Sequence, residues 1–343
     1  MKRKNEDKTL LVCGGAGFIG SHFVRHILHA RPEVRVVNFD KLTYCGNLGN
    51  LNDVRVSPRY QFVKGDIADR RALERIFKKY HPHYVVNFAA ETHVDRSIHA
   101  GAGDFVRTNI DGVYALLETM RMYRDVKKYV QVSTDEVYGD LPLGSRAKFT
   151  EASPVRPSSP YAATKAAGDL LCLAYWRTFG IPVVVTRSGN NFGSHQYPEK
   201  LIPFFVHRLM VGQTLPLYGD GKHVRDWIHV EDHCLALEAV LFHGKEGEIF
   251  NIGAGAEKSN REIARHILGE FGADESRLEL VADRPGHDRR YALDTAKITR
   301  TLGWRSTCAF EKGIRETVRW YRKNTRWIAL VMQKSGAVNT HIA

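Results

Sequence analysis

Short apolar runs alternate with amphipathic stretches along the first half of the chain. The apolar runs cover residues 9–13, 34–39, 60–63, 84–88 and 129–132. Between several of them lie segments with helical spacing of apolar residues, at 18–29, 72–79 and 105–123. This alternation is typical of buried parallel strands joined by crossover helices. It predicts an α/β fold with a Rossmann-type, doubly wound parallel sheet.

The second half of the chain has a less regular pattern. A helix predicted at 161–179 leads into a strand at 182–186, and prolines and glycines then punctuate loops. We therefore expect a smaller C-terminal lobe that binds a substrate. The predicted boundaries are 1–188 for a mainly Rossmann domain, 189–330 for the lobe, with some segments returning to the first domain, and 331–343 for a tail.

Composition narrows the class of protein. Of the 343 residues, 43% are hydrophobic and 26% are charged, which is ordinary for a globular protein. No apolar stretch approaches the roughly 18 residues of a membrane span, and residues 1–8 lack the apolar core of a signal peptide. The five cysteines are scattered, without Cys-x-x-Cys spacing. These features predict a cytoplasmic protein with reduced thiols and no membrane partner.

The formal net charge of +12 admits a nucleic acid, an anionic surface or an anionic small substrate as partner. The sequence has no basic-aromatic run, no helix-turn-helix and no zinc-finger spacing. We therefore expect no nucleic-acid partner, but a basic surface and a few arginines at an anionic ligand. His229, His233 and Cys234 offer one His-x-x-x-His spacing without an evident third ligand, so we expect no metal site.

A glycine-rich turn follows the first predicted strand: residues 14–20 read Gly-Gly-Ala-Gly-Phe-Ile-Gly. Such glycines let the backbone approach a pyrophosphate, and the next helix offers free N–H groups at its N-terminus. Asp40 ends the second strand, where a carboxylate accepts hydrogen bonds from a ribose and repels a 2′-phosphate. The motif predicts NAD rather than NADP; the alternative is a glycine turn with a strand-end cap.

Two further sites follow the third and fourth predicted strands. Asp66 comes after one, and Phe88, Ala89 and Ala90 come after the other, so all lie at the carboxyl edge of the predicted sheet, where ligands bind in such folds. Asp66 could reach the adenine, and the two alanines would let the cofactor lie close. The alternative for each is a strand-end cap or a packing position.

Tyr161 and Lys165 are four residues apart and share one face of a predicted helix. A free tyrosine titrates near pH ~10, and a nearby ammonium group favours the phenolate. Phenolate Tyr161 could take a hydroxyl proton as hydride leaves the carbon, and Lys165 could also hold the nicotinamide ribose. The pair is common by chance, but behind a dinucleotide motif it indicates a redox centre.

Residues 133–139 read Ser-Thr-Asp-Glu-Val-Tyr-Gly, directly after an apolar run. Asp135 and Glu136 add two carboxyl groups for which a plain dehydrogenase has no evident need. Neighbouring carboxyls oppose double ionisation, so one can serve as an acid and the other as a base. The alternative is a pair of turn carboxylates that cap the strand end.

These motifs resemble the extended short-chain dehydrogenase/reductase superfamily and, within it, the dTDP-glucose 4,6-dehydratase family. The matching segments are 14–20, 40–47, 88–97, 133–139, 159–165, 198–203, 224–227 and 283–291. The resemblance extends from about residue 9 to about residue 327. The Asp135–Glu136 pair is its most specific part, because epimerases and decarboxylases of the superfamily share the cofactor motifs.

The resemblance implies an NAD-dependent lyase that converts dTDP-glucose into dTDP-4-keto-6-deoxyglucose and water. NAD would oxidise the sugar at C4 with Tyr161 as base and would later return the hydride to C6. Glu136 would abstract the C5 proton, neutral Asp135 would protonate the departing C6 hydroxyl, and Thr134 would hydrogen-bond the C4 oxygen. These three residues, Tyr161 and Lys165 form the expected catalytic set.

The resemblance also implies binding residues and an assembly. The expected cofactor site comprises Gly14, Gly17, Phe18, Ile19, Gly20, Asp40, Lys41, Leu42, Thr43, Asp66, Ile67, Phe88, Ala89, Ala90, Thr92, Thr108, Tyr161, Lys165 and Asn191. The expected sugar-nucleotide site comprises Thr92, Thr134, Asn190, Lys200, Leu201, Pro216, Tyr218, Arg225, Asn260, Arg284 and His287. Helices at 105–123 and 161–179 would pair in a homodimer.

Other functions stay open at this point. The substrate could carry UDP or CDP, or the protein could be a 4-epimerase, a decarboxylase or a non-catalytic NAD-binding protein. An epimerase needs no C5 base or C6 acid, so Asp135 and Glu136 oppose that alternative. Gly189 stands where the family usually has serine, and Ser194-His195 stands where it usually has Pro-Tyr. Either change could reshape the sugar pocket.

Overall fold

The computed structural model describes residues 8–335. The expected N-terminal tail therefore lies outside the described residues, apart from Lys8, which begins the first strand. The expected C-terminal tail, 331–343, begins inside a helix that runs to Ser335, and its residues 336–343 lie outside the described part.

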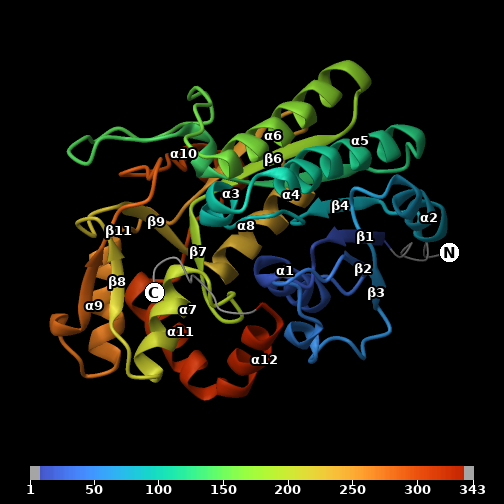
Figure 1. Ribbon diagram of the computed structural model, residues 1–343. Helices are drawn as coiled ribbons and strands as arrows, with labels where there is room; N and C mark the ends of the chain where they lie inside the picture. Colours follow the sequence, from blue (N-terminus) through green and yellow to red (C-terminus); the bar gives the residue numbers. More distant parts are fainter. Residues whose placement is uncertain (1–7, 336–343) are drawn as a thin grey trace.

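A seven-stranded sheet forms the centre of the larger half (Figure 1). Its strand order is β10-β6-β5-β4-β1-β2-β3, and every pair in it is parallel. The strands are β1 (Lys8–Cys13), β2 (Val34–Asp40), β3 (Tyr60–Lys64), β4 (Tyr84–Asn87), β5 (Lys128–Thr134), β6 (Val183–Ser188) and β10 (Ile249–Ile252). The chain runs outward from β1 in both directions, which creates a switch point between β1 and β4, where ligands bind in doubly wound folds. The predicted Rossmann-type architecture is confirmed.

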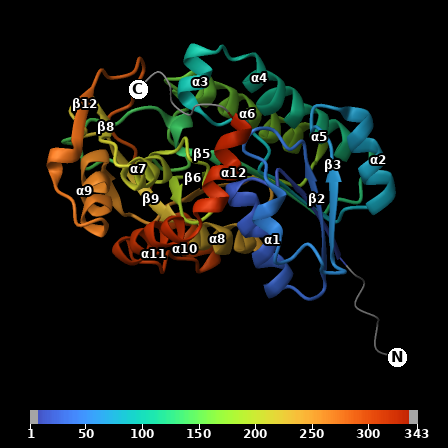
Figure 2. The ribbon, with the colours of Figure 1, turned by 60° about the horizontal axis from the view of Figure 1, so that its bottom comes forward.

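Helices cover both faces of this sheet (Figure 2). One face packs against α1 (Phe18–Ala30), α8 (Val230–His243) and α10 (Ala296–Leu302). The other packs against α2 (Arg70–Tyr80), α5 (Gly112–Met122) and α6 (Pro160–Phe179). The helix predicted at 105–123 is interrupted: α4 (Gly103–Val106) leads into a π-helical turn, η2 (Arg107–Asp111), before α5 begins.

A smaller lobe follows β6 and has its own apolar core. It contains a three-stranded sheet of β11 (Glu257–Ser259), β9 (Val224–His229) and β7 (Asn190–Phe192), and a pair of β12 (Leu278–Val281) and β8 (Leu215–Tyr218). Its helices are α7 (Leu201–Met210), α9 (Asn260–Glu270), α11 (Phe310–Lys323) and α12 (Thr325–Ser335). The remaining short elements are η1 (Leu48–Leu51), α3 (Val94–His99), η3 (Asp135–Tyr138) and η4 (Glu275–Arg277). Among the described residues, no helix combines the length and the hydropathy needed to cross a membrane.

Candidate active site

Three adjoining pockets lie at the carboxyl edge of the large sheet and extend under the lobe. The first two form one cofactor cavity, along the glycine turn and the ends of β2 and β4, and deeper between Tyr161, Lys165 and the Asp135–Glu136 pair. The third is a substrate cavity between α7, β8 and the segment that carries Arg284 and His287. All predicted binding and catalytic residues line these cavities except Leu42. Leu42 instead donates its backbone N–H to Asp40 Oδ1 (2.7 Å).

The glycine turn fits a dinucleotide pyrophosphate. Gly14 has φ +78°, which favours glycine, and a Cβ there would lie 2.5 Å from the backbone nitrogen of Ala89. A Cβ on Gly20 would lie 2.3 Å from the carbonyl oxygen of Gly14. Gly17 caps α1 without a side-chain hydrogen bond, and the first turn carries no acidic residue. The free N–H groups and the positive end of the helix dipole therefore face the cavity without a competing anion.

The adenosine end of the cavity is built from strand ends. Asp40, only 8% exposed, accepts hydrogen bonds from the backbone N–H of Ala16 (2.8 Å) and of Leu42. Each carboxylate oxygen has a further lone pair, so a ribose hydroxyl can still bind. Asp66 is paired with Lys41 (2.9 Å) and Arg107 (3.1 Å). Burial acts to raise its carboxyl pKa, but hydrogen bonds from the Ala68 N–H, Lys41 and Arg107 hold that pKa below the usual value.

The adjacent carboxyl groups lie where β5 ends and the short helix η3 begins. Thr134 caps η3, with its hydroxyl accepting from the Glu136 N–H at 3.3 Å. The same hydroxyl lies 3.3 Å from Asp135 Oδ1 and 3.4 Å from Glu136 Oε1. Both carboxyl groups line the cavity that Tyr161 and Lys165 also line. The arrangement thus brings the predicted catalytic residues into one space.

The surroundings of the two carboxyl groups differ. Asp135 is fully buried, and burial, followed by the nearby Glu136 carboxylate, raises its pKa well above the usual value. Its Oδ2 has no hydrogen-bond partner among the described residues. Burial also raises the pKa of Glu136, but Arg284, Arg225 and Lys200 oppose that rise. These cations favour an ionised Glu136 beside a protonated Asp135, and such separation distinguishes an acid from a base.

Tyr161 and Lys165 lie near the start of α6, which begins at Pro160 and is capped by the side chain of Ser159. The Lys165 ammonium donates to the carbonyl oxygen of Val132 at 2.7 Å, and burial lowers its pKa. Burial and then Glu136 raise the pKa of the Tyr161 phenol, while a hydrogen bond with Thr134 opposes the rise. Activation of the phenol by Lys165 is not among these interactions and stays a prediction.

The cationic side chains of the substrate cavity are fixed in place by contacts with carboxylate and carbonyl oxygens. Arg284 is paired with Asp95 at 3.0 Å, and Lys200 donates to the carbonyl oxygen of Thr92 at 3.0 Å. Arg225 donates to the carbonyl oxygen of Asp288 and lies over a tyrosine ring. Fixed guanidinium groups of this kind suit phosphate oxygens.

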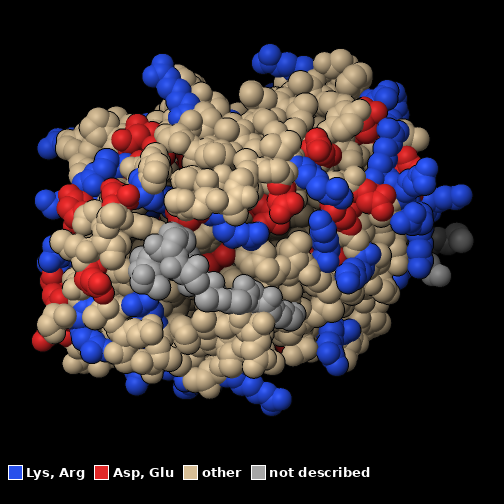
Figure 3. Space-filling view, in the orientation of Figure 1, with Lys and Arg blue, Asp and Glu red and all other residues tan. Residues whose placement is uncertain are grey.

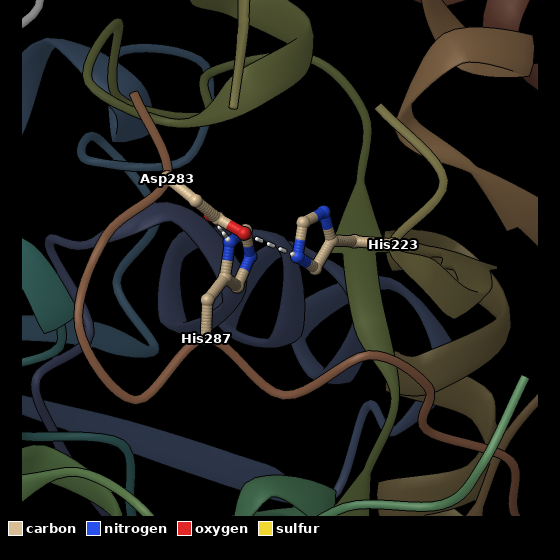
Figure 4. A group of neighbouring side chains, drawn as sticks. All are labelled: His223, Asp283 and His287. Carbon is tan, nitrogen blue, oxygen red and sulfur yellow. Dashed lines mark hydrogen bonds and ion pairs between the residues drawn. The ribbon is translucent and has the colours of Figure 1, made fainter. Parts of the chain in front are cut away.

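His287 belongs to a compact cluster at the edge of the substrate cavity (Figure 4). Its Nδ1 donates to Asp283 Oδ1 at 2.7 Å, and Asp283 Oδ2 lies 3.2 Å from His223 Nε2. The two imidazole rings are stacked at 3.6 Å with an interplanar angle of 11°. Parallel rings direct their in-plane lone pairs along parallel planes rather than at one ion, so this geometry favours a hydrogen-bonded cluster over a metal site.

Some lining residues were not predicted. Asp95 pairs with Arg284 and accepts from the Tyr218 hydroxyl at 3.2 Å, so it positions two predicted substrate residues. Glu199 lies where the cofactor and substrate cavities meet. Both stand inside segments that carried the family resemblance, 88–97 and 198–203, and this was the available signal.

The structure explains why residue 189 is a glycine. A Cβ there would lie 2.6 Å from the carbonyl oxygen of Asp226, so the usual serine would not fit the present backbone. Part of the basic excess lies on one helix. Figure 3 shows Lys and Arg side chains gathered over α2, which contributes Arg70, Arg71, Arg75, Lys78 and Lys79. The substrate cavity is not a second such location, because it is lined by Lys200, Arg225 and Arg284 and also by Asp95, Glu136 and Glu199.

Comparison with known proteins agrees with this geometry. The family described as GDP-mannose 4,6 dehydratase matches residues 11–317. The dTDP-glucose 4,6-dehydratase of Salmonella typhimurium is 47% identical, over 97% of each chain. A dTDP-glucose 4,6-dehydratase structure from Streptomyces venezuelae, with NAD and TYD bound, is 50% identical with a TM-score of 0.90, over 94% of this chain and 99% of that one.

The same fold also occurs with a different activity. The UDP-glucose 4-epimerase of Thermotoga maritima is 31% identical with a TM-score of 0.85, over 92% of this chain and 99% of that one. Fold likeness alone therefore does not separate the two activities, whereas the higher sequence identity to the dehydratases does. The chain belongs to the dTDP-glucose 4,6-dehydratase family of NAD-dependent hydro-lyases, as its motifs predicted.

Proposed function

We propose that this protein converts dTDP-glucose into dTDP-4-keto-6-deoxyglucose and water by the residue roles set out below. The observation that carries the proposal is the presence of Asp135 and Glu136, in different electrostatic surroundings, in one cavity with Tyr161 and Lys165. When bound, NAD supplies the redox chemistry, taking a hydride from C4 of the hexose and giving it back to C6.

Each residue has a defined role in this scheme. Tyr161 removes the proton of the C4 hydroxyl, Lys165 orients the nicotinamide ribose, and Thr134 hydrogen-bonds the C4 oxygen. The C4 ketone acidifies the C5 proton, and ionised Glu136 accepts it. Protonated Asp135 gives its proton to the C6 hydroxyl, which leaves as water while the C5–C6 double bond forms. Glu136 then returns its proton to C5.

The nucleotide lies in the substrate cavity in this proposal. Arg225, Arg284 and Lys200 neutralise the diphosphate, and the same charges keep Glu136 ionised. Pro216, Tyr218 and Asn260 surround the nucleoside end of that cavity. The 2′-hydroxyl and the base distinguish a dTDP-sugar from its UDP and CDP counterparts, so the preference for dTDP rests on the relatives.

The test is incubation of the purified protein with dTDP-glucose, UDP-glucose and CDP-glucose, followed by NMR of the sugar products. We expect a C6 methyl signal and a C4 ketone from dTDP-glucose, with much slower conversion of the other two. A galactose product without a methyl signal would establish the epimerase alternative. Conversion of UDP-glucose or CDP-glucose alone would support the proposed dehydration but reject the proposed preference for dTDP.

We also propose that two copies pair through α5 and α6 and that the protein works in the cytoplasm. Tyr114 and Met122 on α5, and Leu170 and Phe179 on α6, are between 45% and 56% exposed, which is unusual for large apolar side chains on two neighbouring helices. All five cysteines are free thiols, as is common in a reducing compartment.

A further inference from the structure

The C-terminal helix α12 is anchored in the core of the lobe. Ile328 and Val331 on its inner side are 3% and 1% exposed, and Trp327 and Met332 pack against the same apolar cluster as Ile328. Leu330 on the outer side is 53% exposed. Figure 2 shows α12 between α7 of the lobe and α1, which carries the glycine turn at its N-terminus. The helix therefore lies where the two halves meet.

One set of contacts joins α12 to the glycine turn. The Trp327 indole N–H donates to Asn50 Oδ1 at 2.9 Å, and Asn50 Nδ2 donates to the carbonyl oxygen of Ala16 at 3.1 Å. Asn50 is 2% exposed, so water cannot easily replace either bond. Ala16 lies within the turn, and its N–H binds Asp40. Trp327 is thus one side chain away from the backbone that would hold the pyrophosphate.

A second set joins the C-terminal helices to the opposite wall of the cofactor cavity, formed by His195, Gln196 and Tyr197. The Tyr321 hydroxyl donates to the carbonyl oxygen of Gln196 at 2.7 Å, and the Tyr197 hydroxyl donates to that of Val331 at 3.3 Å. His195 has φ +64°, a conformation that side chains rarely adopt, and its ring packs on Trp320 at 4.4 Å.

We propose that α12 is a clasp that retains the dinucleotide, with Trp327 as the positioning residue that ties the glycine turn to the lobe. The reason for a clasp rests on the proposed function: the hydride taken from C4 must return to the same sugar, so a reduced cofactor that left before elimination would strand the intermediate. His195, the second residue of the departure Ser194-His195, belongs to the wall that this clasp holds.

The test measures cofactor release without any sugar. Protein loaded with NADH is mixed with excess NAD+, and the loss of bound NADH fluorescence gives the dissociation rate. Trp327→Phe keeps the ring but removes the N–H donor, and we expect about three- to tenfold faster release. Trp327→Ala also loses the packing, and we expect faster release still, with less NAD retained after gel filtration.

Trp304→Phe is the matched control, because the Trp304 indole N–H has no hydrogen-bond partner among the described residues. Calorimetric titration with dTDP, whose expected site lies in the substrate cavity, checks that each variant is folded. Wild-type release rates in both Trp327 variants, with dTDP binding intact, would overturn the clasp. Failure of the sugar-conversion assay would leave this measurement unaffected, so the two proposals can fail separately.

Discussion

Asp135 and Glu136 are neighbours in the chain, yet the structure surrounds them with different groups. Asp135 lines only the cofactor cavity and lies near another carboxylate, whereas Glu136 also lines the substrate cavity with its arginines and lysine. Two adjacent residues at the end of β5 therefore have different electrostatic surroundings, which is the basis for proposing one as the acid and the other as the base. The burial of Asp135 lowers the free energy of unfolding as the pH rises, because its carboxyl group ionises more easily in the unfolded chain than in the folded protein.

Asp135→Asn should be more stable than the wild type above about pH 5, by an amount that grows with pH. The raised pKa of Asp135 means that its contribution to stability is complete below the unfolded pKa, near ~3.9, and is lost as the pH rises toward the folded pKa. Thermal unfolding between about pH 5 and about pH 8 checks this, with exposed Asp111→Asn as control. A pH-independent difference would contradict a raised pKa.

Tyr161→Phe should lower the rate of sugar oxidation by about 10²–10⁴-fold, because it removes the base of the first step. Absorbance of NADH at single turnover measures this step directly. Tyr114→Phe on the exposed face of α5 is the control and should keep the wild-type rate. Undiminished NADH formation in Tyr161→Phe would remove Tyr161 from the mechanism.

At the scale of elements, most residues of the cofactor cavity lie at or just after the carboxyl ends of strands. The order of β1, α1 and β2, and the helix that begins at Pro160, could be predicted because apolar runs and motif spacing are local signals. The partners of Asp95 and Glu199 could not be predicted, because their contacts depend on how the lobe packs over the sheet. The π turn in η2 also gave no local signal.

A buried ion pair joins two of these elements beneath Lys165. Asp169 on α6 and Arg187 on β6 are 0% and 2% exposed and lie 3.0 Å apart. Arg187→Met should lower the free energy of unfolding by about 3–5 kcal/mol, because it leaves Asp169 buried without its partner. Chemical denaturation measures the loss, and adding Asp169→Asn should restore much of it. An equally large loss in the double variant would show that packing, not charge, is responsible.

At the scale of the whole molecule, the two halves create cavities that neither contains alone. The large sheet supplies the glycine turn and the carboxyl pair, and the lobe supplies Arg225 and Arg284. The architecture was predictable from alternation of strands and helices, but the closure that brings Glu136 to these cations was not, because no local pattern encodes it.

The proposed dimer also belongs to this scale. Leu170→Glu places a charge on the exposed apolar face of α6, where the side chain is 56% exposed. We expect it to shift the mass measured by light scattering from two chains to one, because the charge would be buried in the interface. Leu280→Glu, at a site 60% exposed in the lobe, should leave the mass unchanged. A wild-type protein that runs as one chain would reject the dimer.

The central claim is that Glu136 removes the C5 proton after the sugar has been oxidised at C4. The most direct measurement follows dTDP-glucose in D2O by NMR with the wild type and with Glu136→Gln, while NADH absorbance is recorded. We predict deuterium at C5 of a 6-deoxy product with the wild type, and NADH formation with neither deuterium nor a methyl signal with Glu136→Gln. Deuterium incorporation at the wild-type rate in Glu136→Gln would contradict the assignment.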